Sequence, residues 1–238
     1  MEDSTIIFNG TEYKVQKGTP LLSIARSLNI FIPTLCHNDA LVPYGACRMC
    51  IVEIQKGNRM RVVTSCNYPA EDGLVVKTDT EKVISTRNII MELLIARAPK
   101  NKQIKQLGER LGVTKTRFEE VGDDCIMCGM CIRACEEVVG VSAIGFKNRG
   151  ITRMPATPFM ETSKNCIGCG SCVYVCPTKY IKMEDKGAKR YIYNWKVAFD
   201  MLQCKKCGDF IAPVKQLDYI KKKVSLPEDF FEICNNCR

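Results

Sequence analysis

Eight cysteines in the middle of the chain share one spacing, which occurs twice. Each group reads C-x2-C-x2-C-x3-C, and Pro177 follows the second group. In this pattern three thiolates on one tight loop bind one side of a [4Fe-4S] cluster, and the fourth thiolate comes from the other group. The predicted ligands of the first cluster are Cys125, Cys128, Cys131 and Cys176. The predicted ligands of the second cluster are Cys166, Cys169, Cys172 and Cys135. This crossed ligation predicts two electron carriers held close together.

Four cysteines near the N-terminus have a different spacing, C-x10-C-x2-C-x15-C. It is close to the plant-type [2Fe-2S] pattern, in which the first gap is shorter. Gly45 and Ala46 are small, so backbone N–H groups beside them can approach the cluster sulfurs. Zinc is the alternative, but structural zinc usually takes its ligands from two close pairs. The predicted [2Fe-2S] ligands are Cys36, Cys47, Cys50 and Cys66.

The last four cysteines form two C-x2-C pairs, which are typical of a zinc knuckle. The predicted zinc ligands are Cys204, Cys207, Cys234 and Cys237. A further iron–sulfur cluster and a redox-active dithiol pair remain as alternatives. Between the pairs, Leu217, Ile220 and Val224 predict a helix folded onto this four-cysteine site.

Short elements must position the N-terminal cysteines. Asn9 and Gly10 supply the positive φ angles of a two-residue turn, which predicts a β-hairpin over 6–15. A helix follows, with Thr19 as its expected cap and Pro20 in its first turn. Three β-rich runs come later, at 51–54, 60–64 and 74–77. The order of hairpin, helix, cysteine loop and strands predicts a plant-type [2Fe-2S] ferredoxin-like β-grasp domain over 1–79.

Three further parts complete an α+β protein. Residues 80–121 predict a linker of two helices, the first ended by Pro99, with neither Cys nor His. Residues 122–184 contain both cysteine repeats and predict a bacterial ferredoxin-like domain with two [4Fe-4S] clusters. A Lys-rich turn at 186–190 opens a small metal-bound tail with four cysteines over 185–238.

Composition excludes several classes of protein. The sixteen cysteines do not suggest disulfides, because no apolar leader with a cleavage site is present. No apolar run approaches the ~18 residues of a membrane span, so we expect a cytoplasmic protein without membrane insertion. The formal charge is +9, but each metal centre bound by four thiolates carries about −2, which offsets most of that excess. The sequence lacks a stripe of basic residues interleaved with aromatic ones, so nucleic-acid binding is not predicted.

Isolated residues add little chemistry. His37 is the only histidine, and with Cys36 available as a ligand we expect a non-ligating surface side chain. One histidine cannot form an H-E-x-x-H site. Trp195, the single tryptophan, is expected to anchor a core or an interface. Neither a G-x-G-x-x-G strand–helix turn nor a P-loop is present, so no residue is predicted to be catalytic.

Three segments together resemble one family. They are P-T-L-C at 33–36, G-A-C-R-M-C at 45–50 and C-I-R-A-C-E-E-V at 131–138. These resemble the N-terminal part of the large iron–sulfur subunit of complex I and the short diaphorase iron–sulfur subunit of NAD-reducing and electron-bifurcating hydrogenases. The resemblance covers roughly residues 5–183. Members of that family usually carry one further motif, of one His and three Cys. The linker 80–121 lacks it, so we predict that this additional cluster is missing.

The resemblance implies a non-catalytic electron-transfer subunit of a soluble NAD(P)-linked complex, in the first place a hydrogenase. The implied partners are a flavoprotein binding FMN and NAD(H), a thioredoxin-like [2Fe-2S] subunit, and hydrogenase or other redox subunits. The expected cofactors are one [2Fe-2S] cluster, two [4Fe-4S] clusters and one Zn²⁺. A free-standing polyferredoxin-type carrier and a regulatory or nucleic-acid module held together by zinc are the alternatives.

Overall fold

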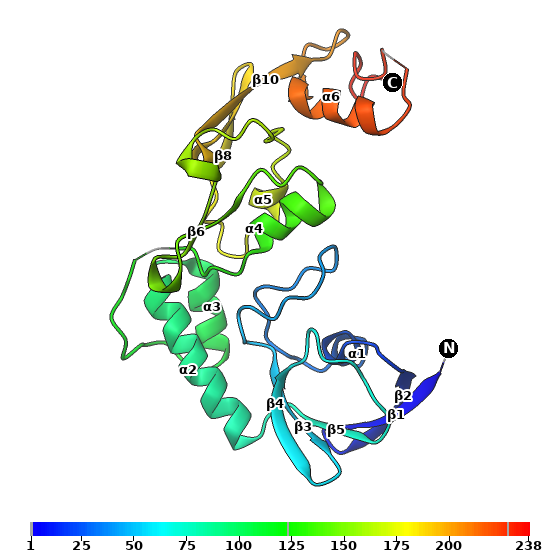
Figure 1. Cartoon of the computed structure of the whole chain (residues 1–238), viewed down its shortest axis with the longest axis vertical. Coiled ribbons are helices and arrows are strands. Elements are labelled where there is room, and N and C mark those ends of the chain that lie inside the picture. Colours follow the sequence, from blue (N-terminus) through cyan, green and yellow to red (C-terminus); the bar gives the residue numbers. More distant parts are fainter. Residues whose placement is uncertain (1, 123, 228) are drawn as a thin grey trace. The chain divides into compact units, whose positions relative to one another are not determined.

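The computed structural model describes residues 2–122, 124–227 and 229–238. The chain divides into two compact units, Met1–Cys128 and Gly129–Arg238, which Figure 1 colours from blue to green and from green to red. Each unit contains its own β-sheet and its own buried core. Within the described ranges, no helix is both long enough and apolar enough to cross a membrane.

A five-stranded mixed sheet forms the centre of the first unit. Its strands are β1 (Asp3–Phe8), β2 (Thr11–Gln16), β3 (Ile51–Lys56), β4 (Arg59–Thr64) and β5 (Leu74–Lys77), in the order β2-β1-β5-β3-β4. The predicted hairpin joins β1 to β2 through Asn9 and Gly10, whose φ angles are 50° and 87°. The β1–β5 pair is parallel and the other pairs are antiparallel. The strands predicted at the three β-rich runs are confirmed.

Helix α1 (Leu21–Ser27) packs its apolar side chains into the core that contains Ile6 and Phe8. The predicted cap is wrong, because Pro20 occupies the N-cap position and no side chain caps the helix. The reason is a backbone contact: the carbonyl of Thr19 accepts a hydrogen bond from the N–H of Ala70 (2.8 Å). Thr19 is thereby held in an extended segment that precedes the helix.

Two helices follow the sheet, as predicted. In α2 (Glu81–Arg97), the hydroxyl of Thr80 accepts a hydrogen bond from the N–H of Val83 (3.3 Å), and the helix ends before Pro99. In α3 (Lys102–Arg110), the side chain of Asn101 accepts one from the N–H of Ile104 (3.3 Å). Both helices therefore start at a side-chain cap of the type that satisfies a free backbone donor. Helix α2 packs against β3 and α3.

The two cysteine repeats fold alike in the second unit. Each contains C-G-x-C, and Gly129 and Gly170 have φ angles of 73° and 78° at the start of a short helix. Only glycine adopts this left-handed conformation at low cost. The surrounding elements are α4 (Met130–Arg133), a π-helical turn (Ala134–Val138), β6 (Gly145–Lys147), a 3₁₀ turn (Gly150–Thr152), β7 (Met154–Ala156), a 3₁₀ turn (Pro158–Met160) and α5 (Ser171–Tyr174). Strands β6 and β7 form an antiparallel pair.

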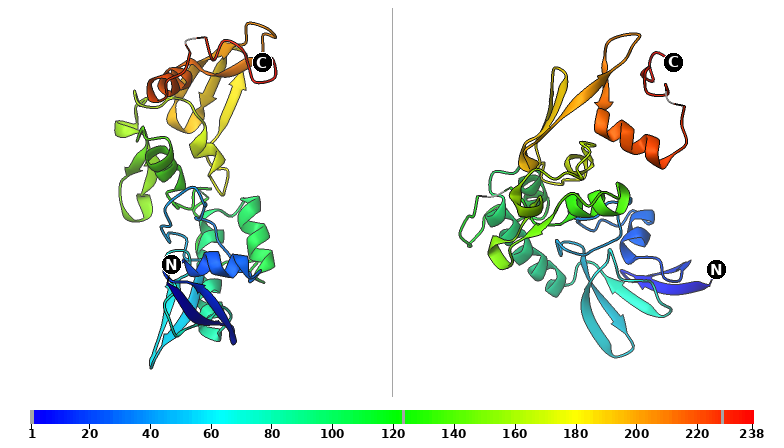
Figure 2. Two further views of the ribbon diagram at one scale, coloured as in Figure 1. Left: turned by 90° about the vertical axis from the view of Figure 1, so that its right-hand side faces the viewer. Right: turned by 45° about the horizontal axis from the view of Figure 1, so that its top comes forward.

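A four-stranded sheet, here called the C-terminal sheet, follows the second repeat. Its strands are β8 (Met183–Lys186), β9 (Lys189–Ile192), β10 (Val197–Gln203) and β11 (Phe210–Pro213), in the order β11-β10-β9-β8. A 3₁₀ turn, Tyr193–Trp195, lies between β9 and β10. Helix α6 (Val214–Lys223) contacts β10 and β11, and Figures 1 and 2 both show it beside them. Leu217 is buried in this helix as expected, whereas Val224 lies beyond its end and is exposed.

Candidate metal centres

All four N-terminal cysteines are buried beside the mixed sheet. Three lie in the loop between α1 and β3, and the fourth follows β4. Their exposed fractions are 2% for Cys36, 7% for Cys47, 1% for Cys50 and 1% for Cys66. Buried thiols outside disulfide bonds suit metal ligation, and none of the sixteen cysteines, all of which the structure describes, is joined in a disulfide. The assignment of these four to a [2Fe-2S] cluster stays a prediction at the level of single residues.

The loop before Cys47 has the close backbone packing that its small residues predict. Gly45 has a φ of 71°, and a Cβ added to it would lie 3.2 Å from the hydroxyl oxygen of Thr64. The N–H of Cys47 donates a hydrogen bond to the sulfur of Cys36 (3.3 Å). Backbone N–H groups that point at ligand sulfurs are a feature of iron–sulfur sites, so this loop fits such a group.

Cys50 and Cys66 share one hydrogen bond between their sulfurs. A bond from the Cys66 thiol lowers the pKa of Cys50 to about 7, and the same bond raises the pKa of Cys66. The hydroxyl of Ser65 donates to the carbonyl of Cys50 (2.8 Å) and fixes the loop. Because a thiol binds metal only after it loses its proton, a pair with one readily lost proton is suited to that role.

Arg87 places a buried positive charge near this site. Its side chain reaches from α2, is 8% exposed, and donates hydrogen bonds from Nη2 to the carbonyls of Ile51 (2.7 Å) and Thr78 (3.4 Å). Burial lowers the pKa of its guanidinium, and the negative charges of Cys50 and Asp79 oppose that shift. Sequence reasoning missed this residue, because nothing in its spacing distinguishes it from a solvent-facing arginine of α2.

Replacing Arg87 with methionine is expected to lower the free energy of unfolding by about 1.5–3 kcal/mol, because buried carbonyls lose a charged donor. The measurement is denaturant unfolding of the full chain, followed by the loss of its iron–sulfur absorbance. Arg59, which is exposed on β4, gives the matched control Arg59→Met, for which we expect no loss. Equal stability of the Arg87 and Arg59 variants would contradict the role assigned to Arg87.

The expectation for His37 is wrong in one respect. Its side chain is only 7% exposed, so it is not a surface residue, and its Nε2 lies 3.1 Å from a carboxylate oxygen of Asp39. That carboxylate also accepts a hydrogen bond from Arg26 of α1 (2.9 Å). Asp39 therefore joins the cysteine loop to α1.

The four cysteines predicted to hold the second cluster line one cavity. They are Cys135, Cys166, Cys169 and Cys172. The rest of the wall is mostly apolar and includes Ala143, Ile144, Ile192 and Trp195. The N–H of Ala143 donates to the sulfur of Cys135 (3.2 Å), and burial raises the pKa of Cys172 to about 12. Four sulfurs around one apolar cavity fit a buried cluster. The structure thus brings Cys135 to the cysteines of the other repeat, and their role as ligands stays a prediction.

The cysteines predicted for the first cluster are all buried, each with 8% exposure. They are Cys125, Cys128, Cys131 and Cys176. A hydrogen bond joins the backbone at Cys125 to α2: Nε of Arg97 donates to the carbonyl of Cys125 (3.0 Å). Cys131 lies in α4, and Cys176 lies in the turn after α5. Their assignment to a single cluster stays a prediction.

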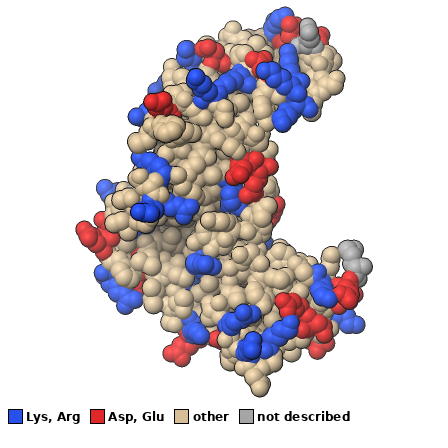
Figure 3. Space-filling view, in the orientation of Figure 1, with Lys and Arg blue, Asp and Glu red and all other residues tan. Residues whose placement is uncertain are grey.

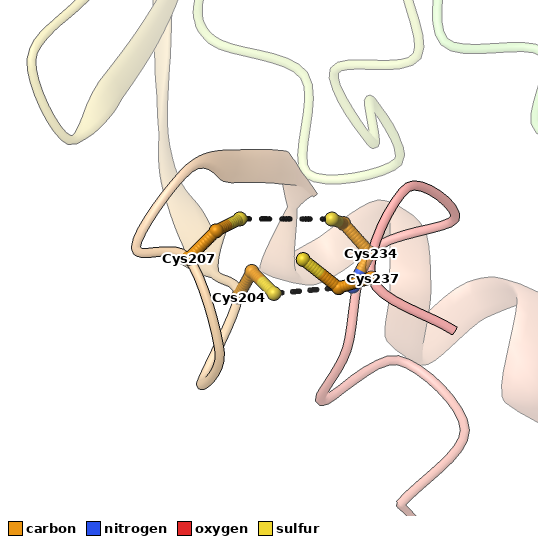
Figure 4. Close-up of side chains that lie close together, drawn as sticks. All are labelled: Cys204, Cys207, Cys234 and Cys237. Atoms are coloured by element: carbon orange, nitrogen blue, oxygen red, sulfur yellow. Dashed lines mark hydrogen bonds between the residues drawn. The ribbon is translucent and has the colours of Figure 1, made fainter.

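The tail cysteines meet as two facing pairs, which Figure 4 shows with all four sulfurs turned toward one point. The sulfurs of Cys204, Cys207, Cys234 and Cys237 all lie within 4.8 Å of one another. Those of Cys207 and Cys234 are 3.7 Å apart, and the N–H of Cys234 donates to the sulfur of Cys204 (3.3 Å). This bond, together with the N–H groups of Cys207 and Lys206, lowers the pKa of Cys204 to about 6. The predicted four-cysteine site is therefore present.

Family models match most of the chain in separate segments. A model described as a 2Fe-2S iron-sulfur cluster binding domain matches residues 2–81. Two models described as a 4Fe-4S dicluster domain match residues 121–183 and residues 165–210. The α+β prediction is confirmed: an N-terminal [2Fe-2S] domain with a mixed sheet, a helical linker, a dicluster domain and a tail with four clustered cysteines.

Three relatives align with about three fifths of the chain. NADPH-Fe(3+) oxidoreductase subunit alpha of Geobacter sulfurreducens is 33% identical over 171 residues, which is 61% of this chain and 20% of the relative. NADP-reducing hydrogenase subunit HndD of Solidesulfovibrio fructosivorans is 32% identical over 182 residues, 64% of this chain and 31% of the relative. The mitochondrial NADH-ubiquinone oxidoreductase 78 kDa subunit of Neurospora crassa is 29% identical over 172 residues, 61% of this chain and 23% of the relative. The chain thus spans a fifth to a third of the length of these relatives.

A solved structure shares the fold. It is a chain of an NAD+-reducing [NiFe]-hydrogenase in the H2-reduced state, with a TM-score of 0.58 and 24% identity. The likeness covers 65% of this chain and 74% of that chain. This likeness concerns the fold, and the family matches and the relatives lead to one conclusion. The chain contains a [2Fe-2S] cluster-binding domain and a [4Fe-4S] dicluster domain, and it is a distant homologue of iron–sulfur subunits of NADH- and NADPH-linked oxidoreductases and hydrogenases.

Proposed function

We propose that the chain is the electron-transfer iron–sulfur subunit of a multisubunit NAD(P)-linked oxidoreductase, in the first place a hydrogenase. One observation carries the proposal: one polypeptide contains three sets of four cysteines, ten of them buried and Cys135 and Cys169 half-buried, and two of the sets lie within a dicluster domain. Thiols of this kind hold groups that accept and pass single electrons. A chain with three such sets in series is suited to carry electrons between two partners that perform the substrate chemistry.

The names of the relatives support the choice of partners. The three relatives are subunits of an NADPH-Fe(3+) oxidoreductase, an NADP-reducing hydrogenase and an NADH-ubiquinone oxidoreductase. We infer one partner that binds FMN and NAD(H), a small thioredoxin-like [2Fe-2S] subunit beside it, and a hydrogenase or other redox module. The N-terminal domain would receive or deliver electrons at the flavin side, and the dicluster domain would do so at the other side.

Anaerobic purification through a tag on this chain tests the proposal. We expect a flavoprotein and a second redox subunit to co-purify, and NADH or NADPH to reduce the clusters of the complex. The chain purified alone should show the electron paramagnetic resonance signals of its clusters after dithionite, without oxidising NADH. Oxidation of NADH by the chain alone would overturn the proposal. Elution at the monomer mass from native extract would support a free-standing carrier instead.

We also propose that the tail cysteines hold one Zn²⁺. A tetrahedral zinc with Zn–S bonds of about 2.3 Å requires sulfurs about 3.8 Å apart. The sulfurs of Cys207 and Cys234 are 3.7 Å apart. Among the residues that the structure describes, this is the one group of three or more Cys, His, Asp or Glu with every ligand atom within 4.8 Å. The thiolates around a [4Fe-4S] cluster are spread more widely, because four irons lie between them.

The second dicluster match favours an iron–sulfur cluster in the tail over zinc, because residues 165–210 include Cys204 and Cys207. That match ends before Cys234 and Cys237, so it covers only one of the two pairs. Two pairs that face each other across a short distance favour a single metal ion over a cubane. We therefore assign more weight to the geometry of all four sulfurs than to a match over two of them.

A further inference from the structure

The indole of Trp195 lies against a predicted ligand of the second cluster. Trp195 ends the 3₁₀ turn between β9 and β10 and is 2% exposed. Its Nε1 donates a hydrogen bond to the sulfur of Cys172, with 3.4 Å between the two atoms. The same indole lines the cavity around Cys135, Cys166, Cys169 and Cys172. The chain has no other tryptophan.

The C-terminal sheet holds this indole in place. Ile192 and Val197, on either side of the 3₁₀ turn, are buried in the same core as Cys166 and Cys172. This turn follows the second cysteine repeat and lies within the dicluster match over residues 165–210, so the donor comes from chain outside the two repeats. Trp195 therefore belongs to a rigid element, and its N–H cannot turn away without breaking that core.

Two glycines of the second repeat show how closely the sheet is packed on the cluster loop. A Cβ added to Gly168 would lie 2.6 Å from Cδ2 of Phe199 in β10. A Cβ added to Gly170 would lie 2.9 Å from the sulfur of Met183 in β8. Side chains from two strands thus pack on Gly168 and Gly170, which are buried, while Cys169 between them is half-buried. In such surroundings one directed hydrogen bond has a larger electrostatic effect than it has in water.

The chemistry of the indole N–H determines in which direction this contact shifts the reduction potential of the cluster. The group is a donor only, and a buried donor needs an acceptor. The acceptor here is the sulfur of Cys172. When Cys172 binds a cluster as a thiolate, reduction adds one negative charge to the bound group, and the N–H stabilises the reduced form more than the oxidised form. Hydrogen bonds to cluster sulfurs are among the factors that set a reduction potential.

We propose that Trp195 is a positioning residue that raises the reduction potential of the second cluster. The proposal rests on the function proposed above, because it requires that Cys172 ligate a cluster. It adds that the C-terminal sheet, besides covering the cysteine loop, supplies the donor that makes an electron more stable there. Sequence reasoning assigned Trp195 to a core or an interface, and it is in a core, but its contact with Cys172 has no sequence signal.

The test is Trp195→Phe in the full chain, which keeps an aromatic ring and removes the N–H. In a redox titration followed by electron paramagnetic resonance, we expect the reduced-to-oxidised ratio of one [4Fe-4S] cluster at a fixed potential to fall about tenfold. For a one-electron couple this is a shift of about 59 mV to lower potential. The [2Fe-2S] cluster and the other [4Fe-4S] cluster should keep their potentials.

Tyr193→Phe is the matched control. Tyr193 belongs to the same 3₁₀ turn, is 48% exposed, and donates its hydroxyl to Glu184 (2.6 Å) instead of a cysteine. We expect it to leave all potentials unchanged. If Trp195→Phe does not assemble, benzothienylalanine at the single tryptophan position keeps the shape of the indole and replaces only the N–H.

The outcomes separate the two proposals. If the unaltered chain assembles no iron–sulfur cluster, the proposed function is contradicted. Assembled clusters whose potentials are all unchanged when the N–H is removed contradict the role of Trp195 and leave the proposed function standing. A potential that rises on loss of the N–H would also overturn this inference.

Discussion

Replacing Cys135 with serine is expected to abolish the second cluster, although Cys135 belongs to the first repeat. The structure places Cys135 around the same cavity as Cys166, Cys169 and Cys172, so its loss leaves three thiolates where four are needed. Iron analysis should show a loss of about four irons per chain. The fluorescence of Trp195 should rise. Its indole lies against Cys172, a predicted ligand of the second cluster, and loss of that cluster removes the quenching group.

Cys131→Ser is the control that makes this result informative. Cys131 lies four residues earlier in the same repeat, and its predicted cluster is the first one. We expect the same loss of about four irons per chain, with Trp195 still quenched by the second cluster. Equal fluorescence of the two variants would contradict crossed ligation. It would indicate that each repeat holds its own cluster with its own four cysteines.

The elements that sequence reasoning predicted correctly are those with strong local signals. The turn at Asn9 and Gly10 requires positive φ angles, and Pro99 cannot continue a helix, so these boundaries depend on only a few residues. The cysteine repeats behave similarly, because the left-handed glycines at 129 and 170 recur with the same spacing. Local chemistry was therefore enough for the β-hairpin, the linker helices and the order of the parts.

The features that were missed depend on contacts between distant residues. In the sequence Thr19 resembles a helix cap, but in the fold its carbonyl accepts a hydrogen bond from the N–H of Ala70. His37 resembles a surface residue, but in the fold its side chain is 7% exposed. The C-terminal sheet was predicted only as a Lys-rich turn, because β8 and β9 are short and carry many charged residues. The turn glycine Gly187 was the available signal.

The candidate sites divide in the same way. Cysteine spacing was sufficient to propose all sixteen ligands, because metal centres constrain the residue type and the spacing together. The residues that surround those ligands were not predictable in this manner. Arg87 is 37 positions from Cys50, and Trp195 is 23 positions from Cys172. Neither is distinguished by its neighbours in the sequence, and only the folded chain shows that each approaches a cysteine.

Loss of the tail metal is expected to release the last turn of α6 and the chain after it. Among the described residues of 204–238, the buried ones are Cys204, Pro213 and Leu217, which is too few for a core of its own. Structural zinc contributes about 10–16 kcal/mol of binding free energy in small Cys-rich peptides. Besides the metal, Lys205–Glu232 (2.5 Å) and the bond from Lys206 Nζ to the carbonyl of Cys237 (3.1 Å) hold the tail, and the hydroxyl of Tyr219 in α6 donates to the carbonyl of Val139 (2.7 Å).

Cys237→Ser tests this expectation, with Asn236→Ser as the control, because Asn236 is the exposed neighbour of Cys237. The last turn of α6 holds Lys221, Lys222 and Lys223, and Figure 3 shows Lys and Arg side chains gathered over that end of the helix. Trypsin should cleave there more than tenfold faster in the Cys237 variant, because an unfolded segment fits the protease and a helix does not. The control and the unaltered chain should contain one zinc per chain and resist cleavage. About four additional irons in place of that zinc would refute the mononuclear site, since only a further cluster would then account for the tail.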